Sequence, residues 1–167
     1  DIVPIGYPTT PEIIYGFGPS ITWKKWDFSV FFQGQANVSL MMSGFEPFGT
    51  QSKNNVLEWI AEDYWSKENQ NPNAKYPRLS SQSNENNYQT NTLWLADRSF
   101  LKLRSIELYY KFPQIWVKKS KILSNAKIYV RGVDLLCFDK INIADPEVYG
   151  ATYPLTRSVV AGLTIGF

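Results

Sequence analysis

The last ten residues of the chain, 158–167, alternate between apolar side chains and small or polar ones. Successive side chains of a β-strand point to opposite faces, so one face of this segment would be apolar. A strand of this length that ends the chain on an aromatic residue is typical of an outer-membrane β-barrel, although a soluble β-sandwich can alternate too. The apolar positions are Val159, Ala161, Leu163, Ile165 and Phe167, and Val160 is the exception to the alternation.

Aromatic residues make up 16% of the chain, with 10 Tyr, 10 Phe and 6 Trp. Such residues favour strands, membrane interfaces and sugar-binding surfaces. No apolar run approaches the roughly 18–20 residues of a spanning helix, but barrel strands of about 9–11 alternating residues do not need one. Because the chain begins with Asp1 and not with Met, we expect an N-terminus that is processed, truncated or cut from a longer chain.

The composition disfavours several classes of function. The net charge is +2 and the basic residues are scattered, so no nucleic-acid footprint is expected. The absence of His removes the commonest general base and the commonest metal ligand. Cys137 is the one cysteine of the sequence and is expected as a single buried thiol. Asp145 and Glu147 follow Asp139 without EF-hand spacing, so neither a metal site nor a catalytic pair is predicted.

Residues 13–23 and 26–35 are predicted to form a hairpin with its turn at 24–25. Trp23 and Trp26 flank this turn on the apolar face of the hairpin. In a barrel they would belong to the aromatic girdle at the membrane interface. In a soluble sheet they would form a cross-strand pair worth about 0.5–1 kcal/mol. The sequence leaves both interpretations open.

The segment from residue 37 to residue 99 is rich in Ser, Asn, Gln and Gly. About sixty residues between strands is too many for a small sandwich but is expected for a long external loop of an outer-membrane barrel. Within this segment, apolar spacing predicts a helix over 53–68. The sequence Asn71-Pro72-Asn73-Ala74 predicts a type I turn.

Further strands are predicted at 100–112, at 126–136 and at the C-terminus. In the first of these the apolar face switches near Arg104-Ser105, so we expect a β-bulge there. The links between strands are long, short and long in turn, which fits strands that cross a membrane. About five strands cannot close a membrane barrel, for which about eight is the minimum. The chain would then be part of something larger.

The order of local motifs along the chain is more informative than its composition. The motifs are Tyr15-Gly16-Phe17, Trp23-Lys24-Lys25-Trp26-Asp27-Phe28-Ser29-Val30, Tyr64-Trp65, Asn71-Pro72-Asn73-Ala74, Tyr76-Pro77-Arg78-Leu79, Trp94 to Ile106, Val130 to Leu136, Asp145-Pro146-Glu147 and Tyr153 to Arg157. In this order they resemble the C-terminal end of SusC/RagA-type TonB-linked outer-membrane transporters, over nearly the whole chain. Two departures are the Gly132-Val133-Asp134 stretch, where the family more often has an Asn just before Leu, and Lys102, where Arg is commoner.

The resemblance implies that residues 1–167 are the C-terminal segment of a TonB-dependent receptor β-barrel, with long extracellular loops. About five strands of a plugged barrel of about 22 would be present, and the plug domain and the earlier strands would lie upstream of Asp1. Such proteins import oligosaccharides or peptides across the outer membrane of Gram-negative bacteria. The expected partners are a SusD-like surface lipoprotein, TonB through the missing N-terminal part, the upstream barrel, outer-membrane lipids and the cargo. No cofactor, nucleic acid or enzymatic activity is expected.

The same picture suggests three groups of candidate site residues. Loop side chains could meet sugar rings or the lipoprotein, or could pack the loop's helix onto the barrel rim and form its turn. Charged strand residues could line a wet lumen, pair with each other or contact the substrate. The terminal aromatic residue would seat a ring at the membrane rim and be read by the barrel-assembly machinery. The candidates are Trp59, Tyr64, Trp65, Asn71, Asn73 and Tyr76 in the loop, Lys102, Arg104 and Glu107 in the strand, and Phe167.

A secreted carbohydrate-binding β-sandwich is the alternative. It would explain the aromatic residues and the Asn-rich loops, but not the long loop or the apolar alternation at the chain end. A glycosidase would need two carboxylates about 5–10 Å apart across a cleft, and no such pair stands out. A sandwich would fold without detergent, an enzyme would turn over sugars, and a barrel segment would do neither.

Overall fold

The computed structural model describes residues 3–42, 56–80, 85–119, 122–141, 144–148, 153 and 155–167. The chain divides into two compact units. The sheet unit consists of Glu12–Ala36, Ser99–Asp139 and Leu155–Phe167, and the loop unit consists of Asp1–Pro11, Asn37–Arg98 and Lys140–Pro154. Among the described residues, no helix has the length and apolar character needed to cross a membrane.

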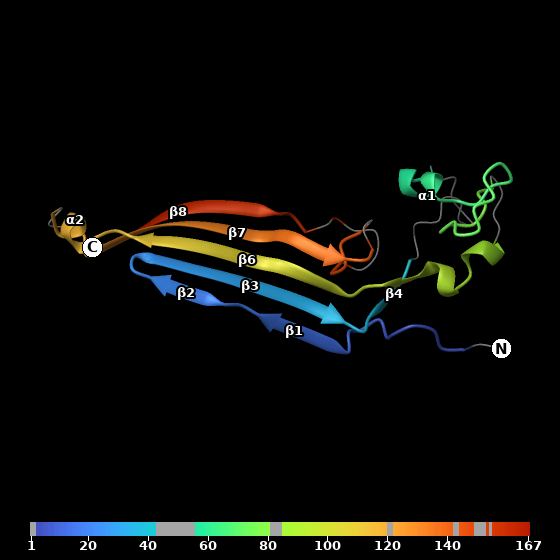
Figure 1. The fold of residues 1–167 in the computed structure, drawn as a ribbon, viewed down its shortest axis with the longest axis horizontal. Helices are drawn as coiled ribbons and strands as arrows, with labels where there is room; N and C mark the ends of the chain where they lie inside the picture. The colour runs from blue at the N-terminus through green and yellow to red at the C-terminus, as the bar shows by residue number, and fades with distance from the viewer. Residues whose placement is uncertain are drawn as a thin grey trace. The chain divides into compact units, whose positions relative to one another are not determined.

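The sheet unit is one antiparallel sheet with the strand order β1-β3-β6-β7-β8 (Figure 1). β1 and β2 pair with opposite ends of β3, so they share one position in the sheet. This arrangement confirms the all-β architecture and the strands predicted from the alternation. The strands are β1 Ile13–Phe17, β2 Ser20–Trp23, β3 Trp26–Ala36, β6 Phe100–Lys111, β7 Asn125–Asp139 and β8 Ser158–Gly166.

Gly18 and Pro19 interrupt the first predicted strand and divide it into β1 and β2. Proline has no N–H to donate to a neighbouring strand, but the Pro19 carbonyl still accepts a hydrogen bond from the Val30 N–H at 3.1 Å. A Cβ added to Gly18 would lie 2.3 Å from the Val30 carbonyl oxygen, so a side chain does not fit there. Both halves of the strand therefore stay paired with β3.

β6 carries the β-bulge predicted at Arg104-Ser105. Against β3, Phe31 lies opposite Ser105 and Phe32 lies opposite Leu103, so Arg104 is the extra residue on β6. The bulge changes which residues of β6 point to each side, as the switch in the apolar pattern indicated. The apolar residues on both sides of the bulge consequently share one face of the sheet.

β7 has its own extra residue opposite this bulge. Ser105 pairs with Val133 and Leu103 pairs with Leu136, so two residues of β7 face one residue of β6. One of the two, Asp134, has a φ of 52°. Asp and Asn are the non-glycine residues that most readily adopt this left-handed conformation, because their short side chains can form local hydrogen bonds.

The alternation separates the sheet into an apolar face and a polar face. Cross-strand partners in an antiparallel pair point to the same side, so the registers assign each strand residue to a face. The polar face carries most of the charged side chains of the strands. Exposed residues of the apolar face are Ile13, Tyr15, Phe17, Ile21, Trp23, Trp26, Phe28, Leu108, Ile128, Val130, Leu136, Phe138, Val159, Leu163 and Ile165.

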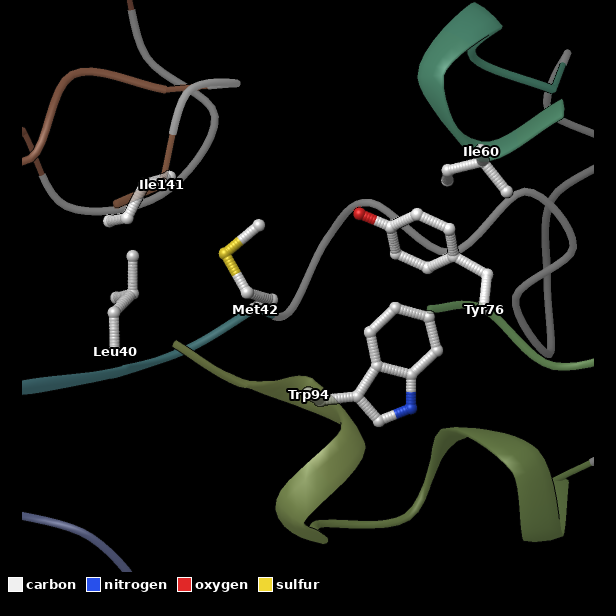
Figure 2. Close-up of a cluster of buried hydrophobic side chains, with 6 residues drawn as sticks. All are labelled: Leu40, Met42, Ile60, Tyr76, Trp94 and Ile141. Carbon is white, nitrogen blue, oxygen red and sulfur yellow. The ribbon is translucent and has the colours of Figure 1, made fainter. Parts of the chain in front are cut away.

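The described part of the loop unit is organised around a buried apolar cluster. The cluster consists of Leu40, Met42, Ile60, Tyr76, Trp94 and Ile141, and Figure 2 shows their side chains converging from separate segments. Such contacts between distant segments stabilise a loop that has little regular structure. The elements of the unit are β4 Ser39–Met41, α1 Glu58–Glu62, η1 Glu85–Tyr88, η2 Thr92–Trp94 and β5 Leu95–Asp97, and β4 pairs with β5.

The helix predicted over 53–68 is wrong in its extent. Only Glu58–Glu62 forms an α-helix, and residues 53–55 lie outside the described part of the chain. After α1 the backbone becomes extended, because the Asp63 carbonyl accepts a hydrogen bond from the Tyr76 N–H and the Trp65 N–H donates to the Tyr76 carbonyl, each at 3.0 Å. Pairing with a distant segment replaces the last helical turns that the local spacing favoured.

The link between β6 and β7 contains a helix, α2 Gln114–Lys119, that the alternation did not predict. The Pro113 carbonyl accepts hydrogen bonds from the N–H groups of Trp116 and Val117 at 3.0 and 3.2 Å. Proline suits the start of a helix, where its missing N–H has no role. The link remains short, as predicted, because the Phe112 N–H already donates to the Ala126 carbonyl at 3.0 Å.

Candidate functional site

The apolar face of the sheet unit is exposed across all of its strands. Trp23 is 63% exposed, Leu163 57% and Val159 69%. Soluble monomers rarely expose contiguous apolar patches of more than a few hundred Å². Transfer of such a surface from water to an apolar medium is favourable. This face is therefore suited to contact with hydrocarbon.

Aromatic side chains gather on the apolar face at the tight turn. Trp23 lies directly opposite Trp26 in the register. The Trp26 ring centre lies 4.7 Å from that of Tyr110, and the Lys24 ammonium lies 4.7 Å from the centre of the Trp23 ring. Amphipathic rings beside a cation suit the boundary between a membrane and water. The same tryptophans thus form a cross-strand pair and fit the place of an aromatic girdle.

Glu107 and Arg131 form an ion pair on the polar face. They are cross-strand partners in β6 and β7, and Arg131 Nε lies 2.7 Å from Glu107 Oε1. The Tyr109 hydroxyl donates to Glu107 Oε2 at 2.8 Å, and Arg131 Nη2 donates to that hydroxyl at 3.3 Å. The ammonium of Lys127 lies 5.2 Å from the centre of the Tyr109 ring. Glu107, a sequence candidate, is therefore part of a charged and hydroxylated array.

Arg104 and Asp134 form a second ion pair on this face, at the two bulges. Arg104 Nη1 lies 2.8 Å from Asp134 Oδ1, and Arg104 Nε donates to Gln33 Oε1 at 2.9 Å. Only 20% of the Arg104 side chain and 17% of the Asp134 side chain are exposed. The guanidinium therefore ties three neighbouring strands together at the point where the register changes.

Lys102, the third candidate of β6, lies on the same face and is 3% exposed. Its ammonium lies 5.5 Å from the centre of the Phe100 ring. The three strand candidates thus share one face of the sheet, with Lys102 the most buried of them. That they line a lumen or touch cargo stays a prediction.

Sequence reasoning missed the partners of these charges. In the sequence, Asp134 stands out only as a departure from the family motif, and Arg131 only as a polar residue that follows the alternating Ala126, Ile128 and Val130. Both pairs depend on the register between β6 and β7, and the double bulge shifts that register by one residue. The available signal was the sign of the charges, because opposite charges favour directly facing positions.

The loop unit contains a cavity of about 280 Å³ beside its apolar cluster. The rings of Tyr76 and Trp94 lie 5.9 Å apart, and Trp94 Nε1 donates to the Asn87 carbonyl at 2.8 Å. The cavity can accommodate a small apolar group with polar contacts at its edge. It is lined by Met42, Lys75, Tyr76, Leu93, Trp94, Leu95, Ala96, Asp97, Lys140 and Ile141.

Two groups of this cavity have shifted pKa values. Lys140 Nζ donates to Asp97 Oδ2 at 2.8 Å, and this hydrogen bond and the Asp97 charge raise the pKa of the Lys140 ammonium. Burial raises the pKa of the Tyr76 hydroxyl, and the Asp63 charge adds to that effect. The cavity therefore presents a neutral phenol and a paired lysine at neutral pH.

Tyr76 and Tyr64 contribute to the packing of the loop. Tyr76 is 5% exposed within the apolar cluster, and the half-buried Tyr64 packs against that cluster. The two residues form an isolated parallel β-bridge. The structure therefore places both rings within the packing of the loop unit. Their proposed contact with cargo or lipoprotein remains untested. Packing of the loop helix onto the barrel rim stays a prediction.

The other loop candidates are the turn residues Asn71 and Asn73 and the two tryptophans Trp59 and Trp65. The turn at Asn71 is confirmed, because the Ala74 N–H donates to the Asn71 carbonyl at 3.2 Å and the Asn73 N–H donates to Asn71 Oδ1 at 3.0 Å. Trp65 is half-buried, while the side chain of Trp59 in α1 lies outside the described part of the chain. Asn71 thus has a turn role, and a contact with ligand stays a prediction.

The carboxylates near residue 145 form a turn. Asp145 Oδ1 accepts a hydrogen bond from the Glu147 N–H at 3.0 Å. The Arg98 guanidinium donates to the carbonyls of Pro146 and Glu147, the latter at 2.9 Å. Within the described ranges, no group of three or more His, Cys, Asp or Glu could hold a metal ion.

Phe167 and Cys137 both belong to the sheet unit. Phe167 follows β8 directly and is 84% exposed, so its ring has little packing within the chain. Cys137 forms no disulfide and is half-buried rather than fully buried, on the polar face of β7 opposite Lys102.

Two curated proteins match almost the whole chain, while no protein-family model matches it. TonB-dependent receptor P26 of Formosa agariphila is 27% identical over 185 residues, which cover 100% of this chain and 18% of that protein. TonB-dependent receptor P3 of the same organism is 25% identical over 180 residues, which cover 98% and 17%. The chain spans about a fifth of the length of the curated relatives it matches.

Solved structures of the RagAB peptide transporter have a similar fold. In one of them, the matched region covers 98% of this chain and 18% of the solved chain, with 25% identity and a TM-score of 0.77. The 'closed-closed' state gives the same values, and the 'open-open' state gives 24% identity, a TM-score of 0.76 and coverage of 96% and 18%. The names of these relatives describe receptors and transporters and not enzymes.

Proposed function

We propose, from the premise that this chain is a segment of a SusC/RagA-family TonB-dependent transporter, that it forms the C-terminal strands of the barrel. The whole protein would import oligosaccharides or peptides across the outer membrane of a Gram-negative bacterium. A SusD-like surface lipoprotein would cap the barrel, and TonB would supply energy through the upstream part. The similarity to TonB-dependent receptors over the full chain supports this proposal.

The observation that carries the proposal is the separation of the sheet into two faces. One face exposes apolar side chains on every strand, and the other holds the ion pairs of Glu107 with Arg131 and of Arg104 with Asp134. A barrel wall has an apolar band outside and a polar interior. A soluble sandwich would instead cover its apolar face with a second sheet.

The edges of the sheet also favour a larger assembly. Among the described strands, β8 pairs only with β7, and β1 pairs only with β3. An exposed strand edge leaves N–H and C=O groups without partners, and a closed barrel removes such edges. The earlier strands of the same barrel would fill both edges.

The cargo belongs to one of two classes. The RagAB structures are named for a peptide transporter, which favours a peptide. An oligosaccharide is the other class that the resemblance implies. The loop candidates Trp59, Tyr64, Trp65, Asn71 and Asn73 would face cargo or lipoprotein, and Lys102, Arg104 and Glu107 would line the lumen. Tyr76 is buried in the apolar cluster and would meet cargo only through the cavity that it lines.

Fractionation of cells with an antibody to the C-terminal region tests the proposal. A chain of 19.2 kDa that spans 18% of its relative predicts a whole protein on the order of 100 kDa in the outer membrane. Deletion of the gene should then abolish growth on the cargo. The SusD-like lipoprotein should copurify with the intact transporter. A soluble band near 19.2 kDa would instead support the carbohydrate-binding sandwich.

A further inference from the structure

The helix α2 exposes large apolar side chains at one end of the sheet. Ile115 is 81% exposed and Trp116 is 65% exposed, and Ile122 in the same link is 72% exposed. Figure 1 shows α2 at the end of the sheet where β6 leads into β7. The registers place the β2–β3 turn at this same end, because Trp26 faces Tyr110 and Tyr110 faces Ile128. We call it the short-link end.

An apolar groove of about 280 Å³ lies between α2 and the apolar face at the short-link end. Leu163 and Ile165 belong both to this groove and to the exposed apolar face, so the two surfaces are continuous. A groove that opens onto a hydrocarbon-facing surface can take a flexible chain that lies along that surface. The groove is lined by Phe112, Trp116, Val117, Leu123, Ala126, Leu163 and Ile165.

Positive charge collects at the same end. The sequence from Lys111 to Lys127 contains five lysines and no Asp or Glu, although the net charge of the whole chain is only +2. Two of the five, Lys111 and Lys127, lie on the polar face, where Lys111 pairs with Asp27, so they are not counted toward the charge beside the groove. Lys119 at the end of α2 is exposed, and so are the turn residues Lys24 and Lys25. The ammonium of Lys24 lies over the Trp23 ring, on the apolar side of the sheet.

We propose that the short-link end binds an anionic glycerophospholipid, with an acyl chain in the groove and its phosphate among the lysines. This inference rests on the proposed membrane location of the chain. Charge complementarity selects the headgroup, and the apolar lining selects the tail. A juxtamembrane lysine contributes about 1 kcal/mol to binding at an anionic surface, or about five-fold in affinity. A free phosphate would use the lysines but not the groove.

The whole transporter, purified in a neutral detergent, tests this site. Dioleoylphosphatidylglycerol and dioleoylphosphatidylcholine are the probes, and native mass spectrometry counts the lipids that each protein retains. We expect tighter binding of the phosphatidylglycerol, at least about ten-fold. The double variant Lys24→Gln/Lys119→Gln should reduce that binding about twenty-five-fold, while Lys67→Gln, a change at an exposed lysine of the loop unit, should leave it unchanged.

Ala126→Phe tests the contribution of the groove separately from that of the charges. Phenylalanine suits a strand and would fill the groove without altering a lysine, so retention of both lipids should fall. Equal retention of the two lipids by the wild type, or full retention by the double lysine variant, would overturn the inference. The wild-type comparison does not depend on the folding of any variant. A transporter found in the outer membrane without this preference would refute the lipid site alone, whereas a soluble protein would refute the proposed function.

Discussion

At the scale of single residues, Asp134 combines a backbone role with a charge role. Its φ is 52°, and its carboxylate pairs with Arg104 in a largely buried site. Asp134→Asn should retain the left-handed backbone and lose the charge, at a cost of about 1 kcal/mol. Asp134→Val should cost about 1–3 kcal/mol more, because a β-branched residue is strained at positive φ. Unfolding of the whole transporter in urea measures both costs.

The order of these two variants is the informative result. If Asp134→Val were no less stable than Asp134→Asn, the backbone at the β7 bulge would not be strained by a branched side chain. Arg104→Lys offers a third comparison, since lysine keeps the charge but cannot bond Asp134 and Gln33 with one planar group. It should fall between wild type and Asp134→Asn in stability.

Two strand glycines differ in how much room surrounds them. A Cβ at Gly34 would lie 2.5 Å from the Phe100 carbonyl oxygen, which is backbone, and 2.4 Å from the Tyr15 ring. A Cβ at Gly162 would meet only the outer atoms of the Tyr129 ring, at 2.4 to 2.6 Å, among its nearest neighbours. A ring can rotate away, whereas a paired carbonyl cannot.

Gly34→Ala should therefore destabilise the barrel by about 1–3 kcal/mol, and Gly162→Ala by less. Gly34→Ala would also disturb the hydrogen bond that the Tyr15 hydroxyl donates to the Phe100 carbonyl at 3.2 Å. The two variants can be compared by the temperature at which half of the protein has lost the compact, folded band on a gel. Equal midpoints would contradict the argument from backbone crowding.

At the scale of elements, β8 offers a matched test of the two faces. Val160 pairs with Arg131 on the polar face, and its neighbour Ala161 pairs with Val130 on the apolar face. Lysine on the lipid side of a barrel costs about 2–4 kcal/mol near the membrane midplane, while the lumen side tolerates it. Ala161→Lys should therefore lower the stability and the outer-membrane level of the transporter far more than Val160→Lys.

Both variants add the same side chain one residue apart. Strand propensity alone would make Val160→Lys the more costly change, because valine suits a strand better than alanine, so the expected order cannot come from propensity. Val160→Lys places a like charge opposite Arg131, and a small loss of stability is expected from that repulsion. A larger loss for Val160→Lys than for Ala161→Lys would assign the lipid to the other face and contradict the proposed orientation of the sheet.

The long strands could be predicted from the sequence because each spans enough residues to show the alternation of apolar and polar side chains. β6 and β8 follow their alternation, and even the bulge at Arg104 left a trace in it. The three-residue strands β4 and β5 are too short to show such a period, and they pair with each other beside the apolar cluster of the loop unit. The local apolar spacing predicted a longer helix than α1, because the pairing of Tyr64 with Tyr76 ends the helix early.

The candidate site was predictable only in part for a related reason. Lys102, Arg104 and Glu107 stood out as charges within an apolar strand. Their environment depends on register, which two bulges shift, so Asp134 could not be paired with Arg104 from the sequence. The chemical type of a strand residue is local information, whereas its partner is set by the neighbouring strand.

At the scale of the whole molecule, packing within the sheet unit does not explain a role for Phe167. Its ring is 84% exposed, so its removal takes away little contact within the sheet unit. β8 ends at Gly166, and its register with β7 ends at the Gly166–Asn125 pair, which does not include Phe167. A large effect of losing this residue would therefore not come from packing within the sheet unit.

Deletion of Phe167 from the full-length gene should lower the outer-membrane level of the transporter several-fold, if the barrel-assembly machinery reads the terminal ring. Phe167→Trp should retain the level because it keeps an aromatic ring, while Phe167→Ser should behave as the deletion does. The protein that does reach the membrane should unfold at the wild-type temperature in all three variants, since the ring makes little contact within the sheet unit. A normal level after deletion would refute the sorting role, and a lowered unfolding temperature would assign Phe167 to barrel stability instead.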